Sequence, residues 1–320
     1  MRTFVIFALA GVFAQMVDGT LGMAYGVTAT SVLLAAGTAP AIASASVHLA
    51  EVGTSLASGA AHWRFGNVDW PVVARIALPG AAGAVLGAYM LTSLSTEAAA
   101  PYMAGLLVML GGYVLLRFSF RPVAAKVISG ARPGARFLAP LGLVAGFIDA
   151  TGGGGWGPVA TSTLLSSGRL EPRKVIGSVD TAEFVVALAA SVGFLFALGS
   201  AQISWLTVGG LLAGGVLAAP FAAWLVRVMP PRLLGTAAGG LIVLTNLRIV
   251  FDAAGVEGDA RTVIYVVLGL AWALALTAAV SALRAGRAEA TEISGAISAD
   301  ISRALSGAGA DQQTAGSATH

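Results

Sequence analysis

Long apolar runs decide what this chain can fold into. A helix that crosses the roughly 30 Å hydrocarbon core of a bilayer needs about 20 mostly apolar residues. Runs of this kind occupy residues 40–62, 72–93, 100–118, 173–198, 204–228, 232–251 and 261–284. We therefore expect an all-α, polytopic membrane protein with seven full crossings.

The composition agrees with a membrane fold and excludes several functions. Hydrophobic residues make up 57% of the 320 residues and charged residues only 10%, whereas a soluble domain carries about 25% charged residues. The 18 lysines and arginines must serve as cytoplasmic anchors, so we expect no nucleic-acid partner. There is no cysteine, which excludes disulfides, thiolate metal sites and iron–sulfur clusters. We expect neither a cofactor nor a metal site.

Two further apolar stretches, 3–36 and 136–167, are too long for one simple helix. Each is cut by a glycine-rich segment, which we call the first tract (Asp18–Gly26) and the second tract (Asp149–Gly157). Each half of either stretch would have about fifteen residues, or about 22 Å of helix, which is too short to span. We therefore expect a broken helix in each stretch.

The sequence repeats itself. Sliding it along itself pairs Gly11 with Gly142, Asp18 with Asp149, Thr20 with Thr151, Gly22 with Gly153, Gly26 with Gly157, Ser46 with Ser178 and Glu51 with Glu183. We expect a first transmembrane repeat at 1–118, a cytoplasmic linker at 119–135 and a second repeat at 136–251. An extra transmembrane helix at 260–284 and a largely disordered cytoplasmic tail at 285–320 follow. Because 136–149 is the counterpart of the N-terminus, residues 3–17 are not expected to be a signal peptide.

Basic residues indicate how the repeats are oriented. The linker region holds Arg117, Arg121, Lys126, Arg132 and Arg136 and should be cytoplasmic. Arg169, Arg173 and Lys174 are also cytoplasmic only if 136–167 enters the membrane and returns as a hairpin. By repeat symmetry 3–36 enters from the outside. The result is two inverted repeats, each with a re-entrant hairpin and three crossings, which is a recurring plan of secondary transporters. The alternative, in which both stretches cross fully, breaks the charge rule at one loop.

The two tracts are the candidate substrate site. A broken helix leaves N–H groups free at the start of its second half, and glycines let an anion approach the backbone. We assign substrate contact to Gly19, Thr20, Gly22, Tyr25 and Gly26, and to Thr151, Gly152, Gly153, Gly154, Gly155, Trp156 and Gly157. The alternative is that the tract glycines serve close helix packing and that the two aromatic residues are plain core residues. For the pairs Gly83/Gly87, Gly210/Gly214 and Gly235/Gly239 we prefer helix packing.

Five acids lie at predicted membrane depth: Asp18, Glu51, Asp149, Asp180 and Glu183. An ionised acid at a helix centre costs about 3 kcal/mol, so these groups must be protonated, paired or exposed to water. Their duplication favours proton or cation handling, and the alternative is that they cap broken helix ends. His48 aligns with Asp180 and lies one turn before Glu51, so we place it in the same proton-handling set. A satisfied buried histidine is the alternative for His48, and His62 is expected to be an interfacial residue.

The same residues resemble a known family. A glycine-rich tract, a proline, a small-residue helix with an acid and then Trp63-Arg-Phe-Gly-Asn-Val-Asp-Trp70, repeated with Gly152–Gly157, is similar to the TauE/SafE sulfite exporter family, also called toluene sulfonate uptake permeases. The resemblance covers about 1–251. It implies transport of sulfite, sulfate, sulfonates or other small organic anions across a prokaryotic plasma membrane, along a path lined by the tracts.

Together these features predict a secondary transporter of a small sulfur-containing or organic anion, coupled to protons. The alternatives are a sodium or metal transporter that uses the buried carboxylates, and a passive anion channel. An enzyme is not expected, since the chain has no cysteine and no convincing Ser/His pair. The expected partners are the anion, membrane lipid and, through glycine-rich faces, a second copy in a homodimer. The C-terminus is expected in the cytoplasm.

Overall fold

The computed structural model describes residues 2–21, 23–120, 132–228 and 231–284, and over these it is helical with no strand. Most of the predicted linker, the whole predicted tail and Gly22 lie outside the described residues. The first half contains α1 (Arg2–Leu21), α2 (Tyr25–Ala35), α3 (Pro40–Arg64), α4 (Trp70–Ser93) and α5 (Thr96–Phe120). The second contains α6 (Ala135–Gly152), the π-helical turn η1 (Gly157–Thr161), α7 (Ser162–Ser167), α8 (Pro172–Leu198), the short 3₁₀ turn η2 (Ser200–Gln202), α9 (Trp205–Val228) and α10 (Pro231–Ala254). A last helix covers Gly258–Arg284.

Within the described residues, five helices are long and apolar enough to cross a membrane: Trp70–Ser93, Thr96–Phe120, Pro172–Leu198, Arg232–Ala254 and Gly258–Arg284. They correspond to five of the seven predicted spans. Within α9, the segment Trp205–Ala219 is apolar but shorter than these five helices. Helix α3 has 25 residues and is long enough, yet it is more polar because it buries serines, His48 and Glu51. The chain is thus a polytopic helical membrane protein.

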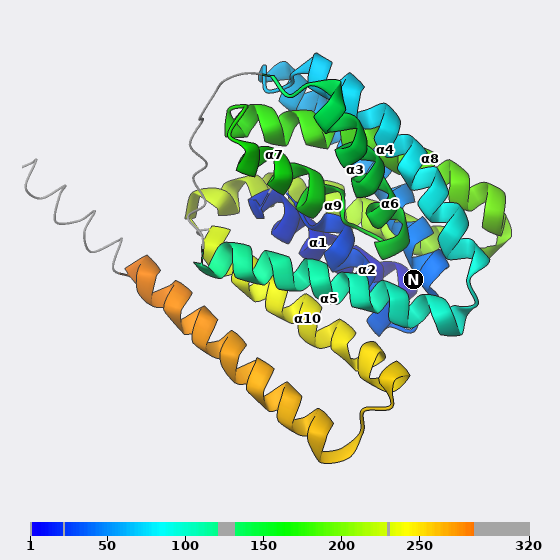
Figure 1. Ribbon diagram of the computed structural model, residues 1–320, viewed down its shortest axis with the longest axis vertical. Helices are drawn as coiled ribbons and strands as arrows, with labels where there is room; N and C mark the ends of the chain where they lie inside the picture. Colours follow the sequence, from blue (N-terminus) through cyan, green and yellow to red (C-terminus); the bar gives the residue numbers. More distant parts are fainter. Residues whose placement is uncertain (1, 22, 121–131, 229–230, 285–320) are drawn as a thin grey trace, which may run out of the picture.

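Glycines let three pairs of helices pack with their backbones in contact. A Cβ atom at Gly210 would meet Phe4 of α1, and one at Gly214 would meet Ala8. In the same way Gly87 of α4 meets the backbone of Phe147 on α6, and Gly239 of α10 meets the backbone of Leu115 on α5. The prediction that these spaced glycines serve helix packing is confirmed. In Figure 1, α5 and α10 lie side by side along one edge of the bundle.

The contacts between helices also fix their directions. Helix α4 runs parallel to α6, since Gly80 meets Gly146 and Gly87 meets Phe147, and parallel to α8, since Gly80 meets Val186 and Ala88 meets Gly193. Because α6 and α8 point the same way, the chain must turn back between them, through η1 and α7. Likewise α1 runs parallel to α9. The chain turns back after α8, so α9 runs opposite to α8. Helix α9, and with it α1, therefore runs parallel to α3.

Both interrupted stretches therefore enter and return on one side of the bundle, and α1 and α6 point in opposite directions. These are the directions that two inverted repeats would give, although the repeats and their boundaries stay a prediction. The predicted equal halves of about fifteen residues are wrong. Helix α1 has 20 residues against 11 in α2, and α6 has 18. The breaks come late because α1 continues to Leu21 and α6 to Gly152. Positive φ angles then occur at Ala24 (121°) and at Gly153 and Gly154 (67° and 144°).

The turn between α3 and α4 marks one end of the bundle. Lys174 donates from Nζ to the carbonyl of Gly66 at 2.6 Å, and Arg132 pairs with Asp69 at 2.8 Å. Trp63 and Trp70 are exposed and pack edge to face beside this turn, as aromatic residues do at membrane interfaces. Since Arg64, Arg169 and Arg173 lie at the same end, we call it the basic end.

The last helix lies outside the bundle, next to α10 (orange beside yellow in Figure 1). Trp272 donates from Nε1 to the carbonyl of Thr236 at 2.9 Å, and the rings of Phe251 and Tyr265 meet edge to face. Its other side exposes large apolar side chains, among them Val267, Leu270 and Leu274. In a bilayer this side faces lipid.

Candidate functional site

The two glycine tracts meet in the interior. A Cβ atom at Gly26 would lie 2.6 Å from the Cα atom of Gly154, and one at Gly157 would lie 2.8 Å from the Cβ atom of Met23. The hydroxyl of Thr30 donates to the carbonyl of Gly153. The structure thus brings the predicted substrate residues of both halves together at the two breaks.

Close backbone contact accounts for several of the tract glycines. A side chain at Gly26, Gly153, Gly154 or Gly157 would collide with the opposite tract, which is the packing role given above as the alternative. Gly152 and Gly155 instead lie against Leu106 and Ile148. Gly19 and Thr20 lie in the last turn of α1, where the structure describes only their backbone, and Gly22 lies outside the described residues. Substrate contact by any of these residues stays a prediction.

Each break carries the same polar contact. The backbone N–H of Tyr25 donates to Oδ1 of Asp18 at 3.1 Å, and that of Trp156 donates to Oδ1 of Asp149 at 2.9 Å. Each carboxylate lies in the last turn of the first half-helix and faces the N-terminus of the returning segment. Helix N-termini attract negative charge. The two positions predicted to attract a substrate anion are therefore occupied by carboxylates of the protein itself.

His48 is fully buried between α3 and α6. Its Nδ1 lies 2.8 Å from the carbonyl of Ser44, and its Nε2 lies 3.2 Å from Oδ2 of Asp149. A carbonyl oxygen can only accept, so Nδ1 carries a hydrogen. The contact with Asp149 then requires one proton between Nε2 and Oδ2. The ring of His48 thus reaches across to Asp149 on α6.

Glu51 points toward the first tract. It is 3% exposed, and its Oε1 would lie 2.8 Å from a Cβ atom at Gly26. Its other carboxyl oxygen, Oε2, is buried and has no hydrogen-bond partner among the described residues. A buried polar atom of this kind is costly, so it marks a position where a proton or a ligand would be bound.

Asp180 and Glu183 belong to the same cluster but are only half-buried. Ser58 of α3 donates to Oδ2 of Asp180, and the carboxyl groups of Asp180 and Glu183 lie within hydrogen-bond reach of each other. Glu183 is in turn an electrostatic neighbour of Glu51, Asp18 and Asp149. All five predicted acids are thus brought together. Among the described residues, no three His, Asp or Glu side chains are arranged to hold a metal ion.

The remaining predicted site residues are held by structural contacts. Tyr25 donates from its hydroxyl to the carbonyl of Leu211 at 3.1 Å, and Trp156 donates from Nε1 to that of Val179 at 2.9 Å. Thr151 donates to the helix carbonyl of Phe147 at 2.7 Å. These bonds anchor all three residues in the core, beside the tracts.

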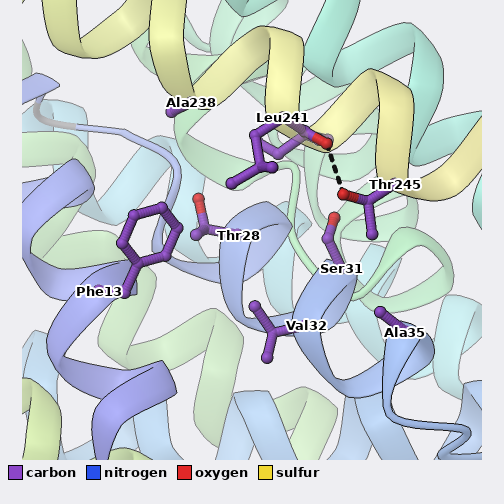
Figure 2. A pocket seen from close by; sticks show the side chains of 9 residues that line it. Phe13, Thr28, Ser31, Val32, Ala35, Ala238, Leu241 and Thr245 are labelled. Atoms are coloured by element: carbon purple, nitrogen blue, oxygen red, sulfur yellow. Dashed lines mark hydrogen bonds between the residues drawn. The ribbon is translucent and has the colours of Figure 1, made fainter. Parts of the chain in front are cut away.

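A cavity of about 200 Å³ lies between α1, α2 and α10. Figure 2 shows its lining, with the hydroxyl of Thr28 pointing toward α10. In the part of the chain that the structure describes, this buried hydroxyl has no hydrogen-bond partner. The same holds for Oδ1 of the nearby Asn246, whose Nδ2 donates to Ser31 at 2.7 Å. Sequence reasoning missed Asn246, although an amide within the apolar run 232–251 was a usable signal. The lining is Phe13, Thr28, Ser31, Val32, Ala35, Ala238, Leu241, Ile242 and Thr245.

A helical bundle with broken helices that meet inside it, beside a cluster of buried acids, defines a multi-pass membrane protein of the transporter class. Residues 7–249 match the family model described as sulfite exporter TauE/SafE, and the chain belongs to this family. It is 49% identical over 272 residues to the probable membrane transporter protein YtnM of Bacillus subtilis (strain 168), covering 85% of this chain and 91% of that protein. No solved structure matches the chain. The predicted family is confirmed, and the chain is a membrane transporter of the TauE/SafE type.

Proposed function

We propose that this protein is a secondary transporter that moves a small sulfur-containing or organic anion, such as sulfite, sulfate or a sulfonate, together with protons. The observation that carries the proposal is the pair of carboxylates, Asp18 and Asp149, bound to the N–H groups of Tyr25 and Trp156. A site built for an anion is thus filled by an internal anion.

The coupling follows from competition for these N–H groups. Protonation of Asp18 or Asp149 removes the negative charge and weakens the bond to the backbone, since hydrogen bonds to ionised acceptors are the stronger ones. The freed N–H group and the helix N-terminus can then bind the anion. One proton taken up for each negative charge of the bound anion leaves the net charge inside the bilayer unchanged, which avoids the cost of burying extra charge.

Binding also has to separate the tracts. Gly26 and Gly154 are in contact, so the anion fits between them only when the two hairpins move apart. Alternating access by movement of one half against the other is typical of transporters with broken helices. We take the tract contact as the state without substrate.

The membrane and orientation are part of the same proposal. The basic end of the bundle, with Arg64, Arg132 and Lys174, would face the cytoplasm of the cell that makes the protein, according to the positive-inside rule. The last helix, which starts at the opposite end, would then return the C-terminus to the cytoplasm. The membrane would be the plasma membrane.

Uptake into proteoliposomes tests this function. Radiolabelled sulfite should accumulate faster when the outside is more acidic than the inside, and sulfate or an organic sulfonate should compete. Sodium and divalent metal flux are measured in the same vesicles. Indifference to sulfite and related anions, together with sodium or metal flux, would contradict the proposal. Sulfite flux at channel-like rates that never exceeds equilibrium would indicate a passive channel instead.

A further inference from the structure

We propose that a proton path runs between α3 and α8 from the basic end of the bundle to the acid cluster, and that His62 is the proton donor and acceptor at its outer end. The inference rests on the proposed proton-coupled function and adds a residue that neither the repeat nor the tracts indicate.

The path begins as a pattern on α3. Residues three or four positions apart share one face of a helix. On α3 this spacing joins six polar residues: Ser44, His48, Glu51, Ser55, Ser58 and His62. The stripe leads from the second tract, where His48 meets Asp149, to the basic end, where α3 finishes at Arg64.

His62 is in contact with both water and the cluster. Its side chain is 26% exposed, and its Nε2 lies 3.8 Å from Oδ2 of Asp180, which is 20% exposed. A small rotation of the ring closes this distance to a hydrogen bond. On the other side of the ring, Nδ1 lies 3.4 Å from Nδ2 of Asn67. Because an amide nitrogen only donates, Nδ1 is the acceptor and the hydrogen of the neutral ring sits on Nε2, facing Asp180.

The charged groups around His62 fit this role. Asp180 faces the ring, and Glu183 lies one turn further along α8. Lys174, in the first turn of α8, donates from Nζ to the carbonyls of Gly66 and Val68. Arg64 follows two residues later on α3 and is exposed.

The proton can then pass inward through groups that touch or neighbour each other. In protonated His62 both ring nitrogens carry a hydrogen, and the amide of Asn67 turns so that its oxygen accepts from Nδ1. The ring passes the Nε2 proton to Oδ2 of Asp180, which breaks one N–H bond and forms one O–H bond. A hydronium ion at the basic end then gives Nε2 a new proton and is left as water. Asp180 lies within hydrogen-bond reach of Glu183, and Glu183 neighbours Glu51 at the first tract. Ser58 donates its hydroxyl to Asp180, and Ser55 donates its hydroxyl to the carbonyl of Glu51. Both serines therefore position the path without carrying the proton.

The test separates proton passage from anion passage. His62→Gln and His62→Ala are compared with Arg64→Gln, an exposed neighbour at the same end. Each is reconstituted, and two rates are measured: exchange of radiolabelled sulfite at equal pH, and sulfite uptake driven by a proton gradient with an internal pH dye. We expect both His62 variants to lose at least about tenfold of the gradient-driven rate and of the dye signal while exchange continues. Added imidazole should partly restore His62→Ala, and Arg64→Gln should behave as the unchanged protein.

Three results would overturn the inference. Normal gradient-driven uptake in His62→Gln would show that protons do not use this residue. If a folded His62 variant loses exchange and driven uptake equally, His62 has a structural role. The same conclusion follows if the variant is unfolded in detergent. Absence of sulfite exchange in the unchanged protein would remove the proposed function itself, and with it the path; this failure is visible before any variant is made.

Discussion

Oδ1 of Asp149 accepts a hydrogen bond of 2.9 Å from the backbone N–H of Trp156, across the break of the second hairpin. Asp18 holds Tyr25 in the same way across the first break. Oδ2 of Asp149 also meets Nε2 of His48. One carboxylate thus links the backbone of the proposed anion site to a group that can exchange a proton.

Replacing Asp149 separates its structural and proton-handling roles. In Asp149→Asn the amide oxygen can still accept from Trp156, and the amide nitrogen can donate to His48, so the folded state should stay nearly as stable. Gradient-driven sulfite uptake should fall by at least about tenfold, because the group no longer binds and releases a proton. Asp149→Ala loses both contacts and should be destabilised by about 1–3 kcal/mol. Thermal unfolding in detergent and vesicle uptake check the pair, and full transport by Asp149→Asn would contradict the coupling scheme.

Glu183→Gln should abolish coupled transport while the amount of folded protein in the membrane is preserved. The substitution keeps the size and hydrogen bonding of a half-buried side chain but removes its proton. The measurement is gradient-driven sulfite uptake, normalised to the membrane-inserted protein. Normal uptake would mean that this acid is structural or idle.

Gly154→Ala should disturb the contact between the hairpins. The φ of 144° at Gly154 is unfavourable for any residue with a Cβ atom, and that atom would collide with Gly26 and Val27. We expect a loss of about 1–3 kcal/mol of stability and impaired sulfite uptake. Gly105→Ala is the matched control, since its Cβ atom would meet nothing within 4 Å. Equal thermal unfolding of the two variants would show that the tracts are not in tight contact.

Thr28→Val tests whether the cavity between α1, α2 and α10 holds a polar ligand. The hydroxyl of Thr28 is buried and has no partner among the described residues, so its replacement by a methyl group should leave stability unchanged or raise it by about 1 kcal/mol. Transport should be unaffected. A lower unfolding temperature, or weaker sulfite uptake, would mean that the hydroxyl binds a ligand in the working protein.

Much of the fold could be predicted from local patterns, because membrane spans and close helix contacts depend on residues near one another in sequence. Apolar runs located the long helices, and the spacing of Gly210 and Gly214 predicted the packing against α1. The tracts were located because glycine and aspartate are unusual together at membrane depth.

The finer geometry of the site depended on contacts between distant segments. Nothing near His48 in the sequence shows that its ring reaches Asp149 on another helix. The break after Gly153 came later than expected because α6 continues through Asp149 before the backbone turns. His62 was predicted to be only interfacial, since its neighbour Asp180 comes from α8, far along the chain.

Proton uptake on sulfite binding tests the central claim most directly. Purified protein in weakly buffered detergent solution is mixed with sulfite, and a pH indicator reports the protons taken up for each anion bound. The exchange of carboxylate for anion at Tyr25 and Trp156 predicts net proton uptake with binding, and less of it in Asp149→Asn. The measurement covers about pH 5 to 8, the range in which protein stability is usually highest. Tight binding of sulfite with no proton uptake at any pH in this range would contradict the claim.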